Sequence, residues 1–346
     1  MNDRFLRACR RQPVDCTPVW FMRQAGRALP EYRAVRERHA LLDIVRFPEL
    51  CAEVTLQPVR RLGVDAAIVF ADITIPFEGL GVDFEIRSGV GPVVARPVRT
   101  PADVEDLERF DPGDLVGSLV EALRLLRRES PVPVIGFAGA PFTLASYLVE
   151  GAPTRRFLEV KRFLHAHPEA WEKLMRRLTD ATITYLTLQA EAGAEVLQIF
   201  DSWVGCLAPE DYRRCVQPHM RRLFAGLSGV PSIHFGTETA GLLPDLAAAG
   251  GDVIGLDWRI DLGRGWDLVG DRAVQGNLDP AVAAGPWEAT RAGAERVLAE
   301  AAGRPGHVFN LGHGVLPETP VDNLRRLVDH VHDVSARAGA PRAATG

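Results

Sequence analysis

The segment Pro18-Val-Trp-Phe-Met-Arg-Gln-Ala-Gly-Arg-Ala-Leu-Pro-Glu-Tyr32 places two arginines just beyond a short apolar run. The run Val19–Met22 predicts a buried strand that delivers Arg23 at its carboxyl end. Three residues that allow the backbone to turn separate Arg23 from Arg27: Gln24, Ala25 and Gly26. Guanidinium groups stay charged and pair bidentately with carboxylates or phosphates. The segment therefore indicates an anion-binding clamp, with two surface arginines in a turn as the alternative.

Seven further apolar runs, each bounded by Gly, Pro, Asp or Asn, have the character of buried parallel strands. They are Ala66–Phe70, Val132–Phe137, Val196–Phe200, Ser232–Phe235, Val253–Leu256, Ala273–Gly276 and Val308–Leu311. Amphipathic segments predict helices at Pro48–Leu62, Leu115–Arg128, Ala170–Ala192, Pro209–Leu227, Ala240–Ala249, Pro286–Ala302 and Val321–Ala336. Two places depart from this alternation. The segment Gly81–Arg99 predicts a hairpin inserted after the second strand, and the link Asp257–Asp271 is too short for a full helix.

Eight strands alternating with helices predict an α/β protein, a (β/α)8 TIM barrel, with a doubly wound open sheet as the alternative. We expect a single domain over residues 1–338 and a frayed tail at 339–346. The active site of such a barrel lies at the carboxyl ends of its strands. The polar or loop-forming residues that follow the eight runs in turn are Arg23, Asp72, Gly139, Asp201-Ser202, Gly236, Asp257, Asn277 and His313.

The composition is that of an ordinary globular protein, with 47% hydrophobic and 25% charged residues and a net charge of −5. The chain has no long basic run of the kind that would indicate nucleic-acid binding. No apolar run reaches the roughly 18 residues of a membrane span. The five cysteines never form a Cys-x-x-Cys pair, and no signal-like apolar segment opens the chain. These features predict a protein of the reducing cytoplasm.

Asp72 is embedded in apolar sequence, between Ile68-Val-Phe-Ala71 and Ile73-Thr-Ile-Pro76. A carboxylate is costly to bury unless it meets a donor or a cation, and burial of this kind is common at functional sites. A helix cap is the alternative, although the apolar neighbours and Pro76 fit it poorly. The pattern favours a functional carboxylate.

Three further candidates follow later strands. The stretch Gly136-Phe-Ala-Gly-Ala-Pro-Phe-Thr-Leu-Ala-Ser-Tyr147 predicts a strand end, a Gly-rich turn and a helix, but lacks the spacing of a dinucleotide site. Ser202 is not in a Gly-x-Ser-x-Gly elbow, which favours a turn or ligand contact over a covalent role. His313 lies between glycines in Asn310-Leu-Gly-His-Gly314, which would let a ligand approach the backbone closely.

The segments 18–32 and 136–143 together resemble the two signature motifs of the uroporphyrinogen decarboxylase family. The likeness extends to Phe70-Ala-Asp72-Ile, Phe200-Asp-Ser202 and Asn310-Leu-Gly-His313-Gly. It implies a cytoplasmic, homodimeric (β/α)8 barrel that uses no metal or organic cofactor. The implied reaction converts the four acetate side chains of uroporphyrinogen to methyls, giving coproporphyrinogen and CO2 in haem synthesis.

The resemblance also implies roles for individual residues. Arg23 and Asp72 would carry catalysis, and Asp72 would face the pyrrole N–H groups. The implied substrate-binding residues are Arg23, Gln24, Ala25, Gly26, Arg27, Arg36, Asp72, Phe137, Tyr147, Phe200, Ser202 and His313. The chain departs from the family pattern at Ala71, where many members have Ser, and at Asp201, where Glu is common.

Two other functions compete with this interpretation. A methyltransferase of similar fold that uses zinc-bound thiolates would carry a His-x-Cys pair, but His234-Phe-Gly and Gly312-His-Gly contain no cysteine. The pair His165 and His167 has no third ligand nearby. A tetrapyrrole carrier without turnover would need most of the same residues, so the sequence leaves that alternative open.

Overall fold

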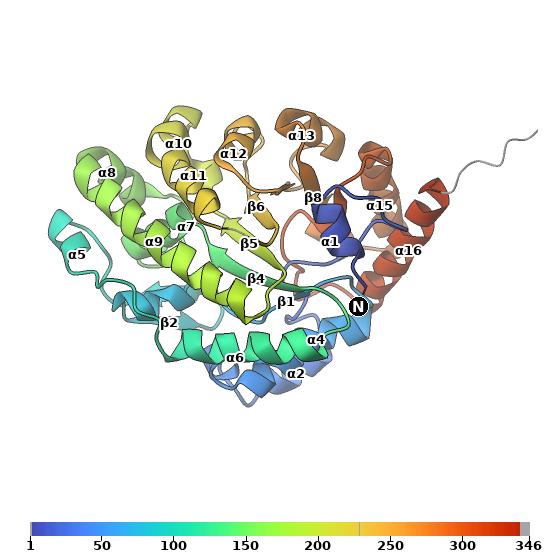
Figure 1. The fold of residues 1–346 in the computed structure, drawn as a ribbon, viewed down its shortest axis with the longest axis horizontal. Helices are drawn as coiled ribbons and strands as arrows, with labels where there is room; N and C mark the ends of the chain where they lie inside the picture. Colours follow the sequence, from blue (N-terminus) through green and yellow to red (C-terminus); the bar gives the residue numbers. More distant parts are fainter. Residues whose placement is uncertain (1, 228, 340–346) are drawn as a thin grey trace, which may run out of the picture.

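The structure is a computed structural model that describes residues 2–227 and 229–339. In these residues seven parallel strands form one curled sheet, in the order β1-β4-β5-β6-β7-β8-β9, with helices around it (Figure 1). They are β1 (Ala67–Ile68), β4 (Val134–Gly139), β5 (Val196–Asp201), β6 (Ser232–Gly236), β7 (Val253–Gly255), β8 (Ala273–Leu278) and β9 (His307–Leu311). Strand order follows chain order, as the predicted TIM-barrel topology requires.

The segment predicted as the first strand, Val19–Met22, is reduced to one parallel bridge between Val19 and Phe309 of β9. The Phe309 carbonyl accepts a bond from Trp20 N at 3.3 Å, and Asp65 N donates to the Val19 carbonyl at 2.7 Å. The segment thus connects β9 to the chain that enters β1. The extended run is short because the chain already turns at Phe21, whose carbonyl accepts from Gln24 N at 3.1 Å.

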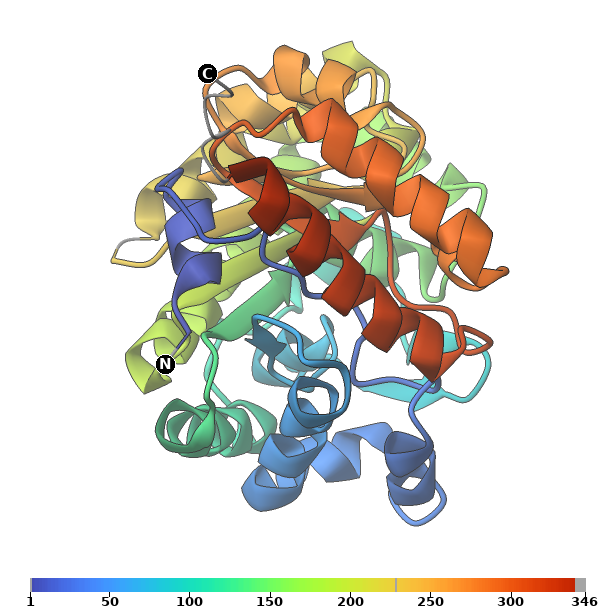
Figure 2. The same ribbon diagram turned by 90° about the vertical axis from the view of Figure 1, so that its right-hand side faces the viewer.

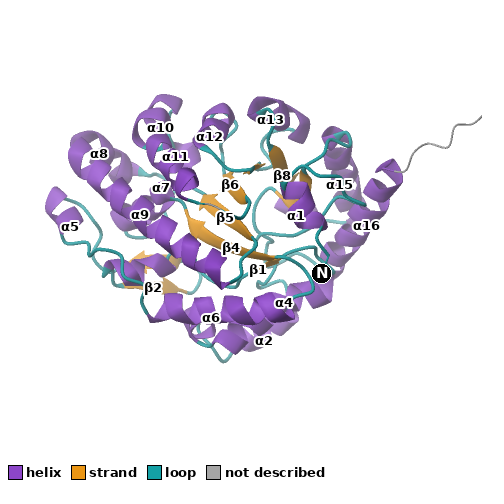
Figure 3. Ribbon diagram, in the orientation of Figure 1, coloured by secondary structure: helices purple, strands orange, loops and turns teal. Residues whose placement is uncertain are grey.

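Helices lie outside the strands (Figure 3), so apolar side chains from both layers are buried between them. The larger ones are α4 (Pro48–Leu62), α6 (Asp114–Glu129), α7 (Pro141–Glu150), α8 (Leu158–Ala166), α9 (Pro168–Ala192), α11 (Gln217–Gly226), α13 (Leu262–Val269), α15 (Trp287–Ala301) and α16 (Val321–Gly339). Shorter ones are α1 (Arg4–Cys9), α2 (Pro30–Arg36), α3 (Leu41–Arg46), η1 (Ile75–Leu80), α5 (Pro101–Glu105), η2 (Val204–Cys206), α10 (Pro209–Cys215), α12 (Leu243–Ala249) and α14 (Pro280–Ala283).

Two predictions about the helices need correction. The segment Pro209–Leu227 is two helices that meet at Val216, because Pro218 cannot continue the hydrogen bonds of a single helix. The link Asp257–Asp271, predicted to be too short for a full helix, contains the eight-residue helix α13. Its buried residues recur at helical spacing, so even two turns can pack against the barrel.

The predicted hairpin is confirmed: β2 (Phe84–Arg87) and β3 (Gly91–Val94) pair antiparallel. At the other end of the chain, α16 extends to Gly339, the first residue of the predicted tail. The remainder of that tail, 340–346, lies outside the described residues. Within the described residues, no helix is both long and apolar enough to cross a membrane.

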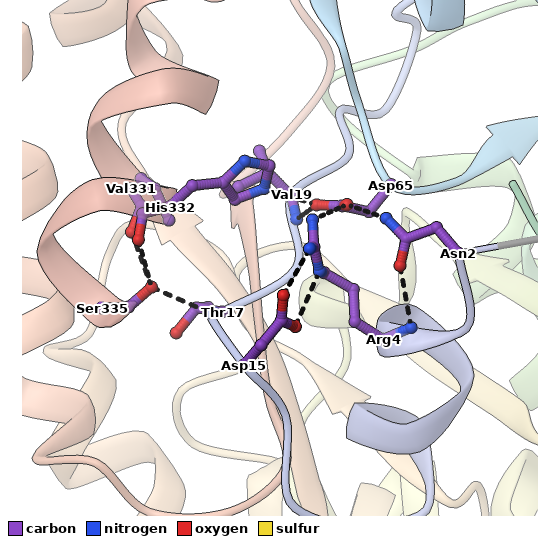
Figure 4. Close-up of polar contacts among 9 residues, drawn as sticks. All are labelled: Asn2, Arg4, Asp15, Thr17, Val19, Asp65, Val331, His332 and Ser335. Atoms are coloured by element: carbon purple, nitrogen blue, oxygen red, sulfur yellow. Dashed lines mark hydrogen bonds and ion pairs between the residues drawn. The ribbon is translucent and has the colours of Figure 1, made fainter. Parts of the chain in front are cut away.

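A buried carboxylate, Asp65, joins the N-terminal segment and the last helix, α16, to the start of β1 (Figure 4). Its Oδ1 accepts bonds from Asn2 Nδ2 and Arg4 Nη1, both at 2.9 Å. Its Oδ2 accepts a bond from Val19 N at 2.8 Å and lies 2.7 Å from His332 Nε2. We call these five residues the closure cluster, because they bring α16, the N-terminal segment and the start of β1 together.

A second link reinforces the closure cluster. Thr17 N donates to Ser335 Oγ at 2.8 Å, and that hydroxyl donates to the Val331 carbonyl at 2.7 Å. In Figure 2 the last helix, α16, accordingly lies beside the N-terminal segment. The first and last parts of the described chain therefore stabilise each other.

Candidate active site

Asp72 lies just beyond β1, in the turn that leads into η1. One of its oxygens, Oδ1, accepts bonds from Thr74 N at 2.9 Å and Thr74 Oγ1 at 2.6 Å. Oδ2 has no hydrogen-bond partner in residues 2–227 and 229–339. Burial raises the pKa of Asp72 above its usual value, against the opposing effects of Thr74 and the charge of Arg23. The carboxylate is thus held at one oxygen and available at the other.

Arg23 adopts a left-handed backbone conformation, with φ of 60°. Two glycines leave room for it. A Cβ on Gly26 would lie 2.5 Å from the Arg23 carbonyl oxygen, and one on Gly314 would lie 2.5 Å from Arg23 Cδ. The loop that carries His313 therefore packs against the Arg23 side chain, which brings residues from both ends of the sequence together.

Tyr147 and Ser202 come from neighbouring βα units. The Tyr147 ring stacks on Trp203, with centroids 4.0 Å apart and an interplanar angle of 29°. Ser202 precedes Trp203 in the turn after β5, and its carbonyl accepts a bond from the Thr237 hydroxyl. Burial, together with the negative charge of Asp72, raises the pKa of Tyr147 well above its usual value. Its phenol is therefore a hydrogen-bond donor at neutral pH.

A row of rings crosses adjacent strands. Phe137 and Phe200 have centroids 5.5 Å apart, Phe200 and Phe235 are 6.0 Å apart, and Phe235 and His313 are 6.4 Å apart. The structure thus brings the predicted apolar walls, Phe137 and Phe200, into one row with His313. Neighbouring rings meet edge to face, at interplanar angles of 86°, 80° and 64°, an arrangement that aromatic pairs prefer.

His313 is kept neutral at physiological pH. Burial, followed by the positive charges of Arg23 and Arg259, lowers its pKa from 6.5 to about 4. Arg259 is held by Asp257 at 2.8 Å and Glu238 at 3.2 Å. A neutral imidazole can donate one hydrogen bond and accept another, so His313 is suited to polar contact without adding charge.

This pKa leads to a stability prediction. Between pH 6.5 and about 4 the unfolded chain binds a proton at His313 that the folded chain does not. The contribution of His313 to the unfolding free energy is therefore complete above pH 6.5 and falls on acidification. In His313→Asn we expect a shallower decline of the unfolding free energy between pH 6.5 and about 5. Denaturant titrations at several pH values measure it, and equal slopes for both proteins would contradict it.

The other predicted substrate contacts lie on the segment after Arg23. Burial raises the pKa of Tyr32, against the opposing positive charges of Arg36 and Arg27. The Tyr32 ring in turn lies 5.4 Å from Phe70 at the end of the β1 run. Neither Arg23 nor Arg27 makes a side-chain hydrogen bond or ion pair within the described chain. Both guanidinium groups are therefore available to an anion.

Gln24 has a different use. Its side chain is 1% exposed, accepts a bond from Phe21 N at 3.0 Å and donates to the Ala66 carbonyl at 2.9 Å. This holds the arginine segment against the start of β1. Between the two arginines, any ligand contact would have to come from the backbone or from the half-buried Ala25 and Gly26.

The sequence analysis did not single out Thr74 or Trp203. Asp72 and Thr74 have the two-residue spacing of a local side-chain turn, so the sequence contained a signal for Thr74. Trp203 acts through a stack with Tyr147, which lies far from it in the sequence, and no local pattern reveals such a contact. In the described part of the chain, no group of three or more His, Cys, Asp or Glu could hold a metal ion.

Comparison with known proteins identifies the family. The profile described as uroporphyrinogen decarboxylase (URO-D) matches residues 1–334. A uroporphyrinogen decarboxylase from Thermus thermophilus is 55% identical over 338 residues, which cover 97% of this chain and 99% of the relative. One from Carboxydothermus hydrogenoformans is 51% identical over 341 residues, 97% of either chain.

Solved structures agree on the fold. A methyltransferase from Methanosarcina mazei matches with a TM-score of 0.82, covering 96% of this chain and 98% of its own, at 23% identity. A B12-independent methionine synthase from Shewanella sp. W3-18-1 has a TM-score of 0.56 and 12% identity, with coverage of 84% and 87%. At such identities the likeness extends to the fold alone. Full-length identity above one half, by contrast, establishes kinship, and the chain belongs to the uroporphyrinogen decarboxylase family.

Proposed function

We propose that this protein binds uroporphyrinogen with Asp72 at the centre of the macrocycle and removes its four acetate carboxyl groups as CO2. Family membership supports the reaction, a decarboxylation in porphyrin and haem synthesis that gives coproporphyrinogen. The enzyme is accordingly a carboxy-lyase. Product analysis after incubation with uroporphyrinogen under reducing conditions tests the reaction.

The observation that best supports the role of Asp72 is the unequal state of its two oxygens. Thr74 holds Oδ1 through two hydrogen bonds, whereas Oδ2 has none within the described residues. The centre of a porphyrinogen presents pyrrole N–H donors. A carboxylate that is fixed at one oxygen and open at the other can accept these donors without first breaking a bond of its own.

The arginines are suited to bind the carboxylates at the edge of the same ligand. Uroporphyrinogen carries eight carboxylates, and Arg23 and Arg27 have no side-chain partner within the described chain. We assign Arg23, Arg27 and Arg36 to carboxylate binding, Tyr147, Ser202 and His313 to polar contacts, and Phe137 and Phe200 to the apolar wall. Arg23 also acts on Asp72 electrostatically, which supports the proposal that Arg23 takes part in catalysis.

The chemistry requires a temporary electron sink. A proton added to the pyrrole carbon beside the acetate-bearing carbon makes the ring a cationic iminium. Cleavage of the acetate C–C bond releases CO2 and sends its electron pair into the ring, leaving an exocyclic methylene. Protonation of that methylene and loss of the first proton give the methyl group. The negative charge of Asp72 would stabilise both cations, and we propose that no metal or organic cofactor takes part.

Arg27→Lys tests the carboxylate clamp. We expect substrate affinity to fall about tenfold although the charge is kept, because an ammonium cannot reproduce a bidentate fork. The measurement is a full substrate titration of the steady-state rate. Arg264→Lys, at an exposed position on α13, is the control. An Arg27→Lys enzyme with the wild-type KM would remove Arg27 from the clamp.

We further propose a cytoplasmic homodimer in which residues 1–338 form a single domain. The family resemblance supports the dimer, and closed two-fold assemblies are the commonest oligomers. Sedimentation at micromolar concentration checks it. Particles of only the 37.8 kDa chain mass would count against the dimer.

A further inference from the structure

The turn after β5 contacts α7 at two positions that lie one helical turn apart. Trp203 N donates to Thr143 Oγ1 at 3.3 Å, and the Trp203 ring stacks on Tyr147 at 4.0 Å. Residues four apart lie on the same face of a helix. Thr143 and Tyr147 therefore present one surface of α7 to this turn, and Ser202 lies inside the segment that they hold.

The Thr143 hydroxyl makes two bonds at once. Besides accepting from Trp203 N, it donates to Asp201 Oδ1 at 3.1 Å. A hydroxyl has one proton to donate and two lone pairs, so both bonds can form together. Thr143 and Asp201 are both fully buried. The hydroxyl consequently holds the residues on either side of Ser202.

Asp201 depends on this hydroxyl. Its other oxygen, Oδ2, has no hydrogen-bond partner in the described structure. That oxygen lies 3.8 Å from His234 Nε2, which is too far for a direct hydrogen bond. In the described residues, Thr143 thus supplies the side-chain hydrogen bond that the buried carboxylate receives.

We propose that Thr143 is a positioning residue that fixes Ser202 and Tyr147 relative to each other, so that both can contact the substrate. This inference rests on the proposed function, because it requires these two residues to bind the tetrapyrrole. It assigns a role to the threonine that ends the Gly136–Thr143 signature. Thr143 itself does not touch the substrate and acts through the turn that it holds.

The test compares Thr143→Val with Thr143→Ser. Valine keeps the shape and removes the hydroxyl, whereas serine keeps the hydroxyl. We expect kcat/KM with uroporphyrinogen to fall about 10- to 100-fold in Thr143→Val, since small misplacements of binding groups cost this much. Thr143→Ser should stay within about threefold of wild type.

The matched control is Thr179→Val. Thr179 is also fully buried, and its hydroxyl donates to the Met175 carbonyl of its own helix at 2.7 Å. The same loss of a buried hydroxyl there should destabilise the fold without changing kcat/KM. A merely structural role of Thr143 can be distinguished from a positioning role by measuring the effect of Thr143→Val with and without changes at Ser202 and Tyr147. In a Ser202→Ala, Tyr147→Phe background, Thr143→Val should have little further effect on kcat/KM.

Each outcome decides the proposal. Wild-type kinetics in folded Thr143→Val, or an undiminished effect in the double background, would overturn it. If Thr143→Val does not fold, Thr143→Ala against Thr143→Ser isolates the hydroxyl. An unfolded Thr143→Ala chain would also overturn the proposal, because the hydroxyl would then serve the fold. Inactive wild-type protein would instead reject the proposed reaction.

Discussion

Replacing Asp72 by Asn is expected to lower the single-turnover decarboxylation rate on the order of 10²-fold or more, while substrate affinity changes far less. Asparagine keeps the size but only one acceptor oxygen, so it can accept the Thr74 bonds or a pyrrole N–H, while the proposed arginine clamp still binds the carboxylates of the substrate. It removes the negative charge that would stabilise the protonated pyrrole. A charge that acts mainly in the transition state appears in the rate rather than in binding.

The measurement combines single-turnover kinetics with equilibrium binding of coproporphyrinogen. Asp72→Glu is the companion variant. It keeps the charge but extends the carboxylate by one methylene, so it should also slow turnover through misplacement. Because burial raises the pKa of Asp72, the wild-type rate should decline on acidification at a higher pH than an ordinary aspartate would give. An unchanged rate in folded Asp72→Asn would remove Asp72 from the mechanism.

Asp65→Ala is expected to lower the unfolding free energy by about 3–5 kcal/mol, because it removes a buried carboxylate that pairs with the partly buried Arg4 and leaves the buried Val19 N–H without its acceptor. The change leaves Arg4 and the backbone N–H of Val19 without the oxygens that they contact at 2.9 and 2.8 Å. It also separates His332 of α16 from the entry to β1. Asp65 is the member of the closure cluster through which the other four are joined.

Denaturant unfolding measures this effect. The control is Asp267→Ala, which removes a carboxylate that pairs with Arg304 at 2.8 Å but is 69% exposed. An exposed pair contributes at most about 1 kcal/mol. If the two variants lose equal stability, the closure cluster does not have the role that its burial indicates.

The strands could be predicted from the sequence and the closure cluster could not, for a physical reason. A buried strand such as Val196–Asp201 is marked locally by its own apolar side chains and by the turn residues that bound it. The closure cluster depends on pairs such as Asp65 and His332, which are 267 residues apart in the sequence. Val19–Met22 looked like a full strand because its apolar pattern is local, whereas the Gln24 side chain at the turn that shortens it bonds both to Phe21 N and to the carbonyl of Ala66, 42 residues away.

The same contrast between local sequence patterns and long-range contacts applies to the residues of the candidate site. Arg23, Asp72 and His313 could be singled out because each follows a predicted strand, and the structure places the charge of Arg23 close enough to act on the other two. Their roles in catalysis and binding stay predictions. Thr143 and Trp203 could not be found in this way, since their contacts join two βα units through a buried hydroxyl and a ring stack.

The most direct test of the account is incubation of the purified protein with uroporphyrinogen under reducing conditions, followed by separation of the products by carboxylate number. We predict stepwise loss of four carboxyl groups as CO2, ending at the four-carboxylate product, coproporphyrinogen. Tight binding of uroporphyrinogen with all eight carboxylates retained would contradict the account and indicate a tetrapyrrole carrier.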